Sequence, residues 1–392
     1  MQTVRIGIIG IGNMGTAHAT CLSKNNINGM VLTALCDICE QRLDYCRENF
    51  PEVQVFSDYH ALFKSGLVDA VLIAVPHRLH SKIAIEAFEA GLHVLTEKPA
   101  DVSVSAARRL NEAAQKSGKI FGIMFNQRTN SLFCKARELV QSGALGALKR
   151  SVWVVTNWYR TQHYYDSGSW RATWSGEGGG VLLNQAPHNL DLWQWICGMP
   201  VSVTAFCDVA KYHHIEVEDD VTIFARYENG ATGLFVTSTG EYPGTNRLEI
   251  SGERGKLVLE NGVLKWWDLA QSEAVFRFAS EESSPTMECN YREFRQEIPE
   301  TAHAGILQNF ANAILNGEDL IAPGYDGIKE LTLSNAAYLS EWNANTEIKL
   351  PFDENEFDTL LAQHAKASTQ KNSQHSTANH HSSYHERWKV RW

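Results

Sequence analysis

The sequence predicts an α/β domain with a doubly wound parallel sheet, followed by an α+β domain built on a large, mostly antiparallel open sheet. Over residues 1–125, continuous apolar runs alternate with helix-like stretches, as in parallel strands covered on both faces. Over residues 126–350, shorter alternating runs separated by turn residues predominate, as in antiparallel strands with one open face. The 392 residues suffice for two cores of this kind.

Six apolar runs are expected to form the first sheet, at 4–9, 30–36, 53–56, 69–75, 92–96 and 119–125. The intervening stretches 78–90 and 103–117 place their apolar residues on one helical face. Right-handed crossovers through such helices give a Rossmann-type sheet. In these sheets, ligands bind beyond the carboxyl ends of the strands, so we expect the site there.

The second domain is expected to begin with a helix at 131–142. Its strands are predicted at 149–157, 202–209, 221–227, 231–239, 247–251, 256–260 and 262–267. The turns Glu228-Asn-Gly230 and Glu260-Asn-Gly262 predict hairpins. Two helices, 302–316 and 327–343, would complete the α+β layer.

Residues 351–392 are expected to form a C-terminal tail. Residues 364–385 are polar and rich in Ser, His, Asn, Gln and Lys, which predicts a partly mobile segment. The last residues, 384–392, carry three aromatics and a valine among basic residues. This composition suggests that the end of the chain docks on the body or on a neighbouring subunit, and a free end is the alternative.

The glycine-rich loop after the first strand reads Gly10-Ile-Gly12-Asn13-Met14-Gly15. The first glycine permits a tight turn, the second lets the backbone approach a pyrophosphate, and the third lets the helix pack closely on the sheet. Asp37, at the end of the second apolar run, can accept hydrogen bonds from ribose hydroxyls. Together they predict NAD binding, with NADP less favoured because a carboxylate repels a 2′-phosphate.

Composition excludes several other classes of protein. The net charge of −10 argues against a nucleic-acid or anionic membrane partner, and no apolar run reaches the ~20 residues of a membrane span. The eight cysteines are scattered as in a cytoplasmic protein with reduced thiols. The pair Cys36/Cys39 has CxxC spacing but straddles Asp37 and lacks a second pair. The sequence therefore predicts no metal site.

Two clusters are candidates for the chemistry. The fifth strand ends in Glu97-Lys98-Pro99, which would bring Lys98 out beside the nicotinamide, aimed inward if a cis peptide bond precedes the proline. Further on, Gly178-Gly-Gly180 precedes Asn184, His188 and Asp191. If that segment is one helix, these three side chains share a face. A strand-end lysine and a buried core histidine are the structural alternatives.

These motifs, in this order and spacing, resemble the glucose–fructose oxidoreductase / inositol dehydrogenase (Gfo/Idh/MocA) family over residues 1–350. The resemblance implies NAD(P)-dependent chemistry on sugars, inositols and their derivatives, and a homodimer or homotetramer. It also implies that Lys98 contacts the reacting hydroxyl and that His188 is the catalytic acid/base. Asn184 stands where the family often has aspartate, which puts the proton relay in doubt.

The expected reaction is hydride transfer between nicotinamide and a secondary hydroxyl of a small-molecule carbohydrate or polyol. Lys98 and His188 would form the acid–base and oxyanion-stabilising pair, with either one as the base. The alternative is an NAD-dependent, redox-neutral glycosidase of the same family. A non-catalytic NAD-binding protein is a third interpretation, which the presence of Lys98 and His188 disfavours.

Residues of both sheets are expected to line the site. Aromatic faces stack on sugar C–H surfaces and Arg or Asn groups bind hydroxyls, although about half of the aromatics between 157 and 174 should only pack a loop. The residues expected to contact the cofactor are Gly10, Gly12, Asn13, Met14, Gly15, Asp37, Pro76, Glu97, Lys98 and Asn126. Those expected to contact the substrate are Lys98, Arg128, Tyr159, Arg160, His163, Trp170, Asn184, His188 and Tyr242.

Overall fold

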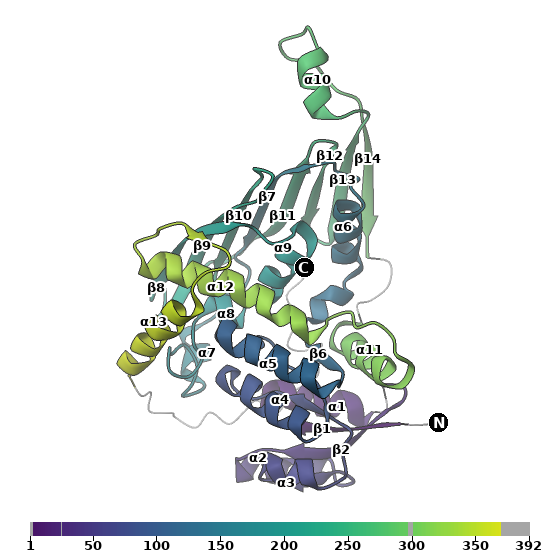
Figure 1. Ribbon diagram of the computed structural model, residues 1–392, viewed down its shortest axis with the longest axis vertical. Coiled ribbons are helices and arrows are strands. Elements are labelled where there is room, and N and C mark those ends of the chain that lie inside the picture. Colours follow the sequence, from purple (N-terminus) through teal and green to yellow (C-terminus); the bar gives the residue numbers. More distant parts are fainter. Residues whose placement is uncertain (1–2, 25, 297–300, 370–392) are drawn as a thin grey trace.

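The computed structural model describes residues 3–24, 26–296 and 301–369. Its first sheet is six-stranded and fully parallel, in the order β3-β2-β1-β4-β5-β6, which confirms the predicted doubly wound domain (Figure 1). The strands are β1 Val4–Ile9, β2 Met30–Cys36, β3 Gln54–Phe56, β4 Ala70–Ile73, β5 His93–Thr96 and β6 Phe121–Ile123. The strand order reverses between β1 and β4, the switch point where such sheets bind ligands.

Helices connect these strands. They are α1 Asn13–Ser23, α2 Glu40–Asn49, α3 Tyr59–Lys64, α4 His80–Glu89 and α5 Val104–Ser117, with short 3-10 turns η1 His77–Leu79 and η2 Asn126–Thr129. Local sequence sets the ends of α5. The Ser103 hydroxyl accepts the Ala106 N–H at 3.4 Å, and Gly118 ends the helix at φ 64°.

The second sheet has nine strands in the order β14-β13-β12-β11-β7-β10-β9-β8-β15. All neighbours pair antiparallel except β7 and β10, which pair in parallel, so the predicted mostly antiparallel sheet is confirmed. The strands are β7 Leu148–Val155, β8 Ser202–Val209, β9 Glu218–Arg226, β10 Thr232–Ser238, β11 Asn246–Gly252, β12 Gly255–Glu260, β13 Val263–Leu269, β14 Cys289–Arg295 and β15 Ile348–Lys349. Both predicted hairpin turns are present, between β9 and β10 and between β12 and β13.

The remaining helices are α6 Ser131–Gln141, α7 Gln162–Asp166, α8 Val181–Asn184, α9 Pro187–Cys197, α10 Glu273–Ala279, α11 Ala302–Asn316 and α12 Gly327–Trp342, preceded by η3 Gly324–Asp326. Helices α6, α9 and α12 lie across one face of the nine-stranded sheet (Figure 1). Helix α11 returns to contact η2 and β1. The chain therefore crosses back to the first domain after the second sheet is complete.

The beginning of the expected tail is a helix. Helix α13, Glu354–Ala367, contacts α5 and buries Phe357 and Leu361, whose spacing of four places them on one face; the Phe357 ring stacks on Trp342 of α12. An Asp358 carboxylate also accepts the Ser105 hydroxyl at 2.5 Å. Residues 364–367 of the segment expected to be mobile belong to this helix. Residues 370–392, with the end expected to dock, lie outside the described residues.

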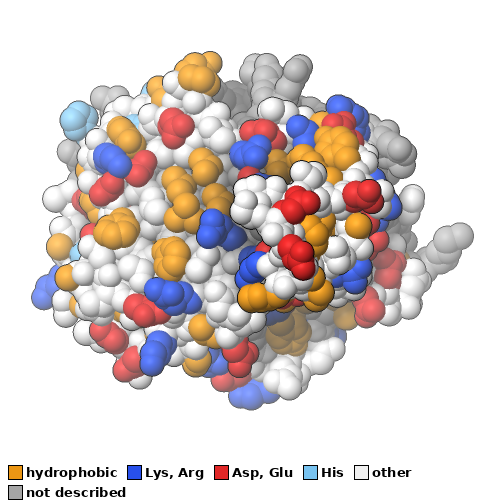
Figure 2. Space-filling view, turned by 90° about the horizontal axis from the view of Figure 1, so that it is seen from above, with side chains coloured by type: hydrophobic (Ala, Val, Ile, Leu, Met, Phe, Trp, Pro, Cys, Tyr) orange, Lys and Arg blue, Asp and Glu red, His pale blue; other side chains and the backbone are white. Residues whose placement is uncertain are grey.

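Helix α10 projects from the sheet between β13 and β14 (Figure 1) and exposes 85% of Phe278. Figure 2 looks onto this end of the molecule, where hydrophobic, basic and acidic side chains are interspersed. Within the described ranges, no helix is both long enough and apolar enough to cross a membrane.

Candidate functional site

The glycine loop has a distinct constraint at two of its positions. Gly10 has φ +89°, and a Cβ there would lie 2.6 Å from the Ala74 carbonyl oxygen. A Cβ on Gly15 would lie 1.9 Å from the Gly10 carbonyl oxygen. The exposed Gly12 faces open space and precedes α1, whose start has no side-chain cap. The first N–H groups of α1, at Asn13 and Met14, are thus suited to hold a pyrophosphate.

Asp37 follows β2 beside this loop. Its two oxygens accept the Ile11 N–H at 2.7 Å and the Cys39 N–H at 2.9 Å, so the carboxylate is fixed in direction. The next side chain, Ile38, is 94% exposed and can pack on an adenine ring. Arg42 lies against the loop, where its guanidinium donates to the Ile11 carbonyl and the Thr16 hydroxyl, both at 2.6 Å. These residues fit the adenosine half of a dinucleotide.

Lys98 leaves the carboxyl end of β5, and a cis peptide bond joins it to Pro99, as the sequence suggested. Its half-buried amine donates to the Asn184 carbonyl oxygen at 2.6 Å. The pKa of Lys98 is lowered because the amine is removed from water. Three glutamates oppose this effect, Glu97, Glu177 and Glu330. Burial outweighs the glutamates, so the net effect is a lowered pKa, which favours the neutral amine that can accept a proton.

Glu97 is buried beneath Lys98 and accepts a hydrogen bond from His18 Nε2 on α1 at 2.8 Å. The pairing with His18 outweighs burial and lowers the pKa of Glu97 to about 2. Glu97 was expected to contact the cofactor, and its carboxylate is instead held inside the domain. Pro76 lies at the carboxyl end of β4, where it precedes η1.

The segment after the triple glycine forms two helices, so the expected single helical face is wrong. Helix α8 ends at Asn184 and α9 begins at Pro187, which lacks an N–H and would clash with the preceding turn. His188 lies in the first turn of α9, 3% exposed, with its ring beside Phe125. Burial and the charge of Lys98 hold the pKa of His188 well below its ordinary value.

The triple glycine permits close packing on three elements. A Cβ on Gly178 would lie 2.5 Å from Val102, one on Gly179 2.2 Å from the Tyr338 hydroxyl, and one on Gly180 2.0 Å from the Glu218 carbonyl oxygen. This packing fixes the start of α8, and thereby the carbonyl group that holds Lys98.

Glu218, on β9, caps α8 from inside the protein. Its carboxylate accepts the Gly180 and Leu182 N–H groups at 2.9–3.0 Å and the Tyr338 hydroxyl at 2.7 Å. Burial raises the pKa of Glu218 to about 7, although these donors favour the charged form. Its position before a run of alternating strand residues gave no signal for this role in the sequence.

Arg128 does not face a substrate, contrary to expectation. It is 2% exposed, donates twice to Asp191 at 2.6 and 2.8 Å, and donates to Asp326 at 2.7 Å. Its guanidinium also lies over the rings of Phe125 and Trp195. Asp191 therefore pairs with Arg128 and does not form the single helical face with Asn184 and His188 that the sequence had suggested. A buried ion-pair network, rather than a binding contact, occupies this arginine.

Asn126, at the carboxyl edge next to β6, fits the cofactor. Its side-chain oxygen is buried, and no residue in the described ranges donates a hydrogen bond to it. An amide group of a nicotinamide is a donor of the kind that this oxygen lacks.

The loop expected to bind substrate is only partly exposed. Tyr159 and Tyr242 are exposed and their rings lie 5.4 Å apart, while His163 is exposed on α7. Trp170 contacts the His77 ring at 5.5 Å, and Arg160 donates to the Tyr159 carbonyl at 2.9 Å. As expected for about half of the aromatics, Trp158 and Tyr165 are buried.

Tyr164 is the member of this loop that reaches Asn184, the residue whose carbonyl group holds Lys98. Its hydroxyl donates to the Asn184 side-chain oxygen at 3.3 Å and accepts from Arg171 at 2.8 Å. Arg160 and Arg171 lie over its ring at 5.0 and 4.6 Å. The aromatic and arginine content of the loop was the signal for this cluster, but not for which tyrosine would take part.

Glu330, on α12, is fully buried, and neither of its carboxylate oxygens has a hydrogen-bond partner among the described residues. Burial and the nearby Asp191 raise the pKa of Glu330 well above its ordinary value. The folded state therefore keeps this proton when the unfolded chain has lost it. The protein therefore loses stability as the pH rises above about 4.3, the pKa of a glutamate in the unfolded chain.

Glu330→Met is accordingly expected to stabilise the protein by about 2 kcal/mol at pH 8 and by less at pH 5, because an apolar side chain of similar size removes the buried acid. Urea unfolding at the two pH values measures this. Glu89→Met, on the exposed end of α4, is the control and should leave stability unchanged. A loss of stability at pH 8 in Glu330→Met would contradict the assignment.

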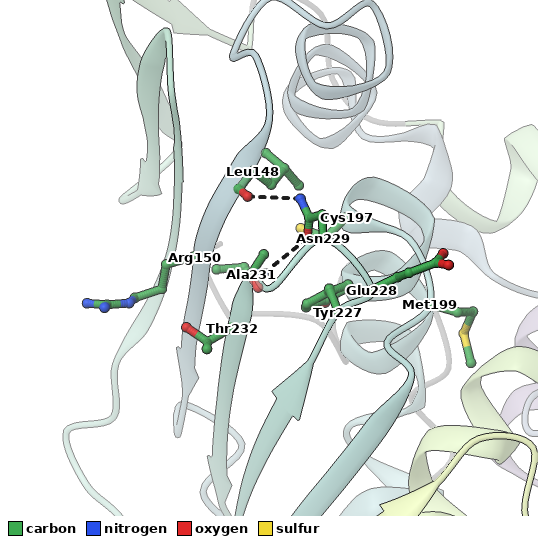
Figure 3. Close-up of a pocket in the computed structure, with 10 residues that line it drawn as sticks. Leu148, Arg150, Cys197, Met199, Tyr227, Glu228, Asn229, Ala231 and Thr232 are labelled. Carbon is green, nitrogen blue, oxygen red and sulfur yellow. Dashed lines mark hydrogen bonds between the residues drawn. The ribbon is translucent and has the colours of Figure 1, made fainter. Parts of the chain in front are cut away.

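A depression of about 430 Å³ lies at the turn between β9 and β10 (Figure 3). Asn229 shapes it, since its side chain donates to the Leu148 carbonyl at 3.1 Å and accepts the Ala231 N–H at 3.0 Å. None of the expected site residues lines it. In the part of the chain that is described, no group of three or more His, Cys, Asp or Glu residues is placed to hold a metal ion.

Comparisons with known proteins identify the family of this chain. Residues 4–125 match the model of an oxidoreductase family with an NAD-binding Rossmann fold, GFO_IDH_MocA, and residues 133–258 match the GFO/IDH/MocA C-terminal domain. The chain belongs to the Gfo/Idh/MocA family. Its members bind NAD in the domain that carries the glycine loop here.

One relative and two solved structures span most of the length of this Gfo/Idh/MocA protein. Myo-inositol 2-dehydrogenase of Thermotoga maritima is 27% identical over 340 residues, which cover 85% of this chain and 95% of that protein. The WlbA dehydrogenase from Bordetella pertussis, in complex with NADH and UDP-GlcNAcA, is 25% identical with a TM-score of 0.75, covering 90% of this chain and 100% of that one. Levoglucosan dehydrogenase bound to NADH and levoglucosan shares the fold, at 21% identity and TM-score 0.74 over 89% of this chain and 100% of that one.

Proposed function

We propose that this protein is an NAD-dependent dehydrogenase that transfers a hydride between nicotinamide and a secondary hydroxyl of a sugar, an inositol or a sugar derivative. The observation that carries the proposal is the Lys98 amine, held 2.6 Å from the Asn184 carbonyl at the carboxyl edge of the parallel sheet, with His188 on the next helix. A dehydrogenase of this kind needs a base for the hydroxyl proton beside the hydride acceptor. The inositol and sugar dehydrogenases among its relatives support the substrate class.

Lys98 is the better candidate for the base. Its lowered pKa favours the neutral amine, which can take the hydroxyl proton. Burial and the charge of Lys98 lower the pKa of His188, which weakens it as a base, so we assign His188 the orientation of the hydroxyl and the relay of the proton. When bound, the nicotinamide accepts the hydride at C4. Asn184 orients the Lys98 amine through its carbonyl group.

The remaining expected residues are assigned by their place in the site. Gly10, Gly12, Asn13, Met14, Gly15, Asp37, Pro76 and Asn126 would hold the cofactor. Tyr159, Arg160, His163, Trp170 and Tyr242 would line the outer part of the substrate pocket. We also propose a cytoplasmic homodimer or homotetramer formed through the nine-stranded sheet, where Phe206 of β8 is 55% exposed on the face opposite α12.

The first experiment follows NADH absorbance and released aglycone together. Purified protein with NAD is offered inositols, aldoses, anhydrosugars and aryl glycosides. Stoichiometric NADH from an inositol or a free sugar supports the proposed dehydrogenase and names its substrate class. NAD-dependent release of aglycone without accumulation of NADH would support the redox-neutral glycosidase and overturn the proposal.

The preference for NAD over NADP is proposed to depend on Asp37, whose charge would repel a 2′-phosphate. Asp37→Ser is expected to weaken NAD binding about tenfold and to improve NADP binding by a similar factor. Titration of tryptophan fluorescence with each cofactor measures the two affinities. Asp44→Ser, at an exposed position of α2 where the carboxylate pairs with Arg47, is the control with unchanged preference. Equal preference in Asp37→Ser and the original protein would contradict the role of the carboxylate.

A further inference from the structure

Glu177 is a buried carboxylate next to the proposed catalytic cluster. Its side chain is 1% exposed and precedes the triple glycine. One oxygen accepts the Ala172 N–H at 2.6 Å, and the other accepts the side-chain amide of Asn184. Because both oxygens accept N–H donors, these hydrogen bonds favour the ionised carboxylate.

A continuous set of contacts joins this carboxylate to the Lys98 amine. The Asn184 amide nitrogen donates to Glu177, and the Asn184 backbone carbonyl accepts from Lys98 at 2.6 Å. The Asn184 side-chain oxygen accepts the Tyr164 hydroxyl at 3.3 Å, which fixes the orientation of the amide. Glu177 and Lys98 therefore contact one residue from two sides.

We propose that Glu177 is a positioning residue that supplies the carboxylate missing at position 184, acting through Asn184 to hold and charge-balance the Lys98 amine. The inference depends on the proposed function, since Lys98 is the base there. In the sequence, Asn184 was a departure that left the proton relay in doubt. The structure places a carboxylate one hydrogen bond away, contributed by a residue seven positions earlier.

The charges around the two groups are consistent with this role. Burial is the largest influence and raises the pKa of Glu177, whereas Arg171, the hydrogen bonds from Ala172 and Asn184, and Lys98 favour its ionised form. His77 contacts the Glu177 backbone carbonyl at 3.2 Å. Around Lys98, Glu97 acts in the same direction as Glu177, Glu330 does so only in its ionised form, and Arg160 acts against them. His77, His188 and His303 are further titratable neighbours, and burial together with the charge of Lys98 lowers the pKa of each.

Glu177 also has a purely structural role, because it holds the turn at Ala172. A test must therefore remove the negative charge of Glu177 while keeping its hydrogen bonds to Ala172 and Asn184. In Glu177→Gln the amide can still accept from Ala172, and Asn184 can turn its oxygen toward it. In the double variant Glu177→Gln/Asn184→Asp, the carboxylate introduced at position 184 accepts from the amide introduced at position 177 and from Tyr164, so the charge returns to the same place.

The measurement is the pH dependence of Lys98 acetylation by acetic anhydride, read by mass spectrometry of the Lys98 peptide in the intact protein. Glu177→Gln is expected to shift the apparent pKa of Lys98 to lower pH by about one unit, because a negative charge near the ammonium is lost. The double variant is expected to restore it. Asn184→Asp alone places two carboxylates in contact and should shift the Lys98 pKa upward.

Catalysis gives the second readout. The limb of the kcat/KM profile that belongs to Lys98 should move in the same direction, and kcat should fall about tenfold or more in Glu177→Gln and recover in the double variant. An unchanged Lys98 profile in Glu177→Gln, or no recovery in the double variant, would overturn the inference. A wild-type protein that forms no NADH would instead overturn the proposed function. The acetylation measurement would still test whether Glu177 affects the pKa of Lys98.

Discussion

Lys98→Ala should abolish turnover while NAD still binds. The substitution removes the amine that lies at the carboxyl end of β5 and is held by the Asn184 carbonyl. Loss of a general base typically costs about 10²- to 10⁴-fold in rate, so kcat should fall by about 10³-fold. Calorimetric titration with NAD should give an affinity within about twofold of the original, because the glycine loop and Asp37 are untouched.

Two further variants separate the base from a simple positive charge. Lys98→Arg keeps the charge but cannot take a proton, so it should be nearly as inactive as Lys98→Ala. A small primary amine added to Lys98→Ala should restore part of the rate, with a dependence on amine pKa. Retention of substantial activity by Lys98→Arg would contradict the base assignment and favour His188 in that role.

Arg128→Met is expected to have the largest effect on stability. The guanidinium is the partner of Asp191 and Asp326, and its loss leaves the buried Asp191 without a cation, while Asp326 keeps its pair with Lys329. Removing one member of a buried pair costs about 3–5 kcal/mol, which should lower Tm by about 5 °C in a chain of this size. Differential scanning calorimetry measures the shift.

Asp191→Asn in the Arg128→Met background should recover part of the lost stability, because one uncompensated charge is removed. The Tm of Arg128→Lys should lie between those of the original protein and Arg128→Met, since an ammonium cannot make the two parallel hydrogen bonds to Asp191. For the protein that remains folded, KM should stay close to the original value. A raised KM with unchanged Tm would show that Arg128 contacts substrate after all.

Both sheets and most element boundaries were predictable because they depend on local periodicity. Runs such as 4–9 and 30–36 are apolar throughout because both faces of the parallel sheet are covered, and β1 and β2 match them. Strands β14 and β15 were not predicted. Residues 289–295 are nearly all exposed, so they lack an alternating pattern, and Ile348–Lys349 is too short to show one.

The candidate site was less predictable, because its geometry depends on long-range contacts. The motif at 97–99 located Lys98, but nothing near Arg128 in the sequence shows that Asp191 and Asp326 would enclose it. Glu177 and Glu218 approach the triple glycine from a turn and from another strand. Pro187 did carry a local signal, since a proline four residues after Leu183 disfavours one continuous helix.

Isotope transfer tests the central claim most directly. The panel compound that gives the fastest reaction is prepared with deuterium on the carbon that carries the reacting hydroxyl, and the nicotinamide product is examined by NMR. Direct hydride transfer predicts one deuterium at C4 of NADH for each substrate oxidised, on a single face of the ring. Deuterium that remains in the carbohydrate product, with no labelled NADH accumulating, would contradict a net dehydrogenase.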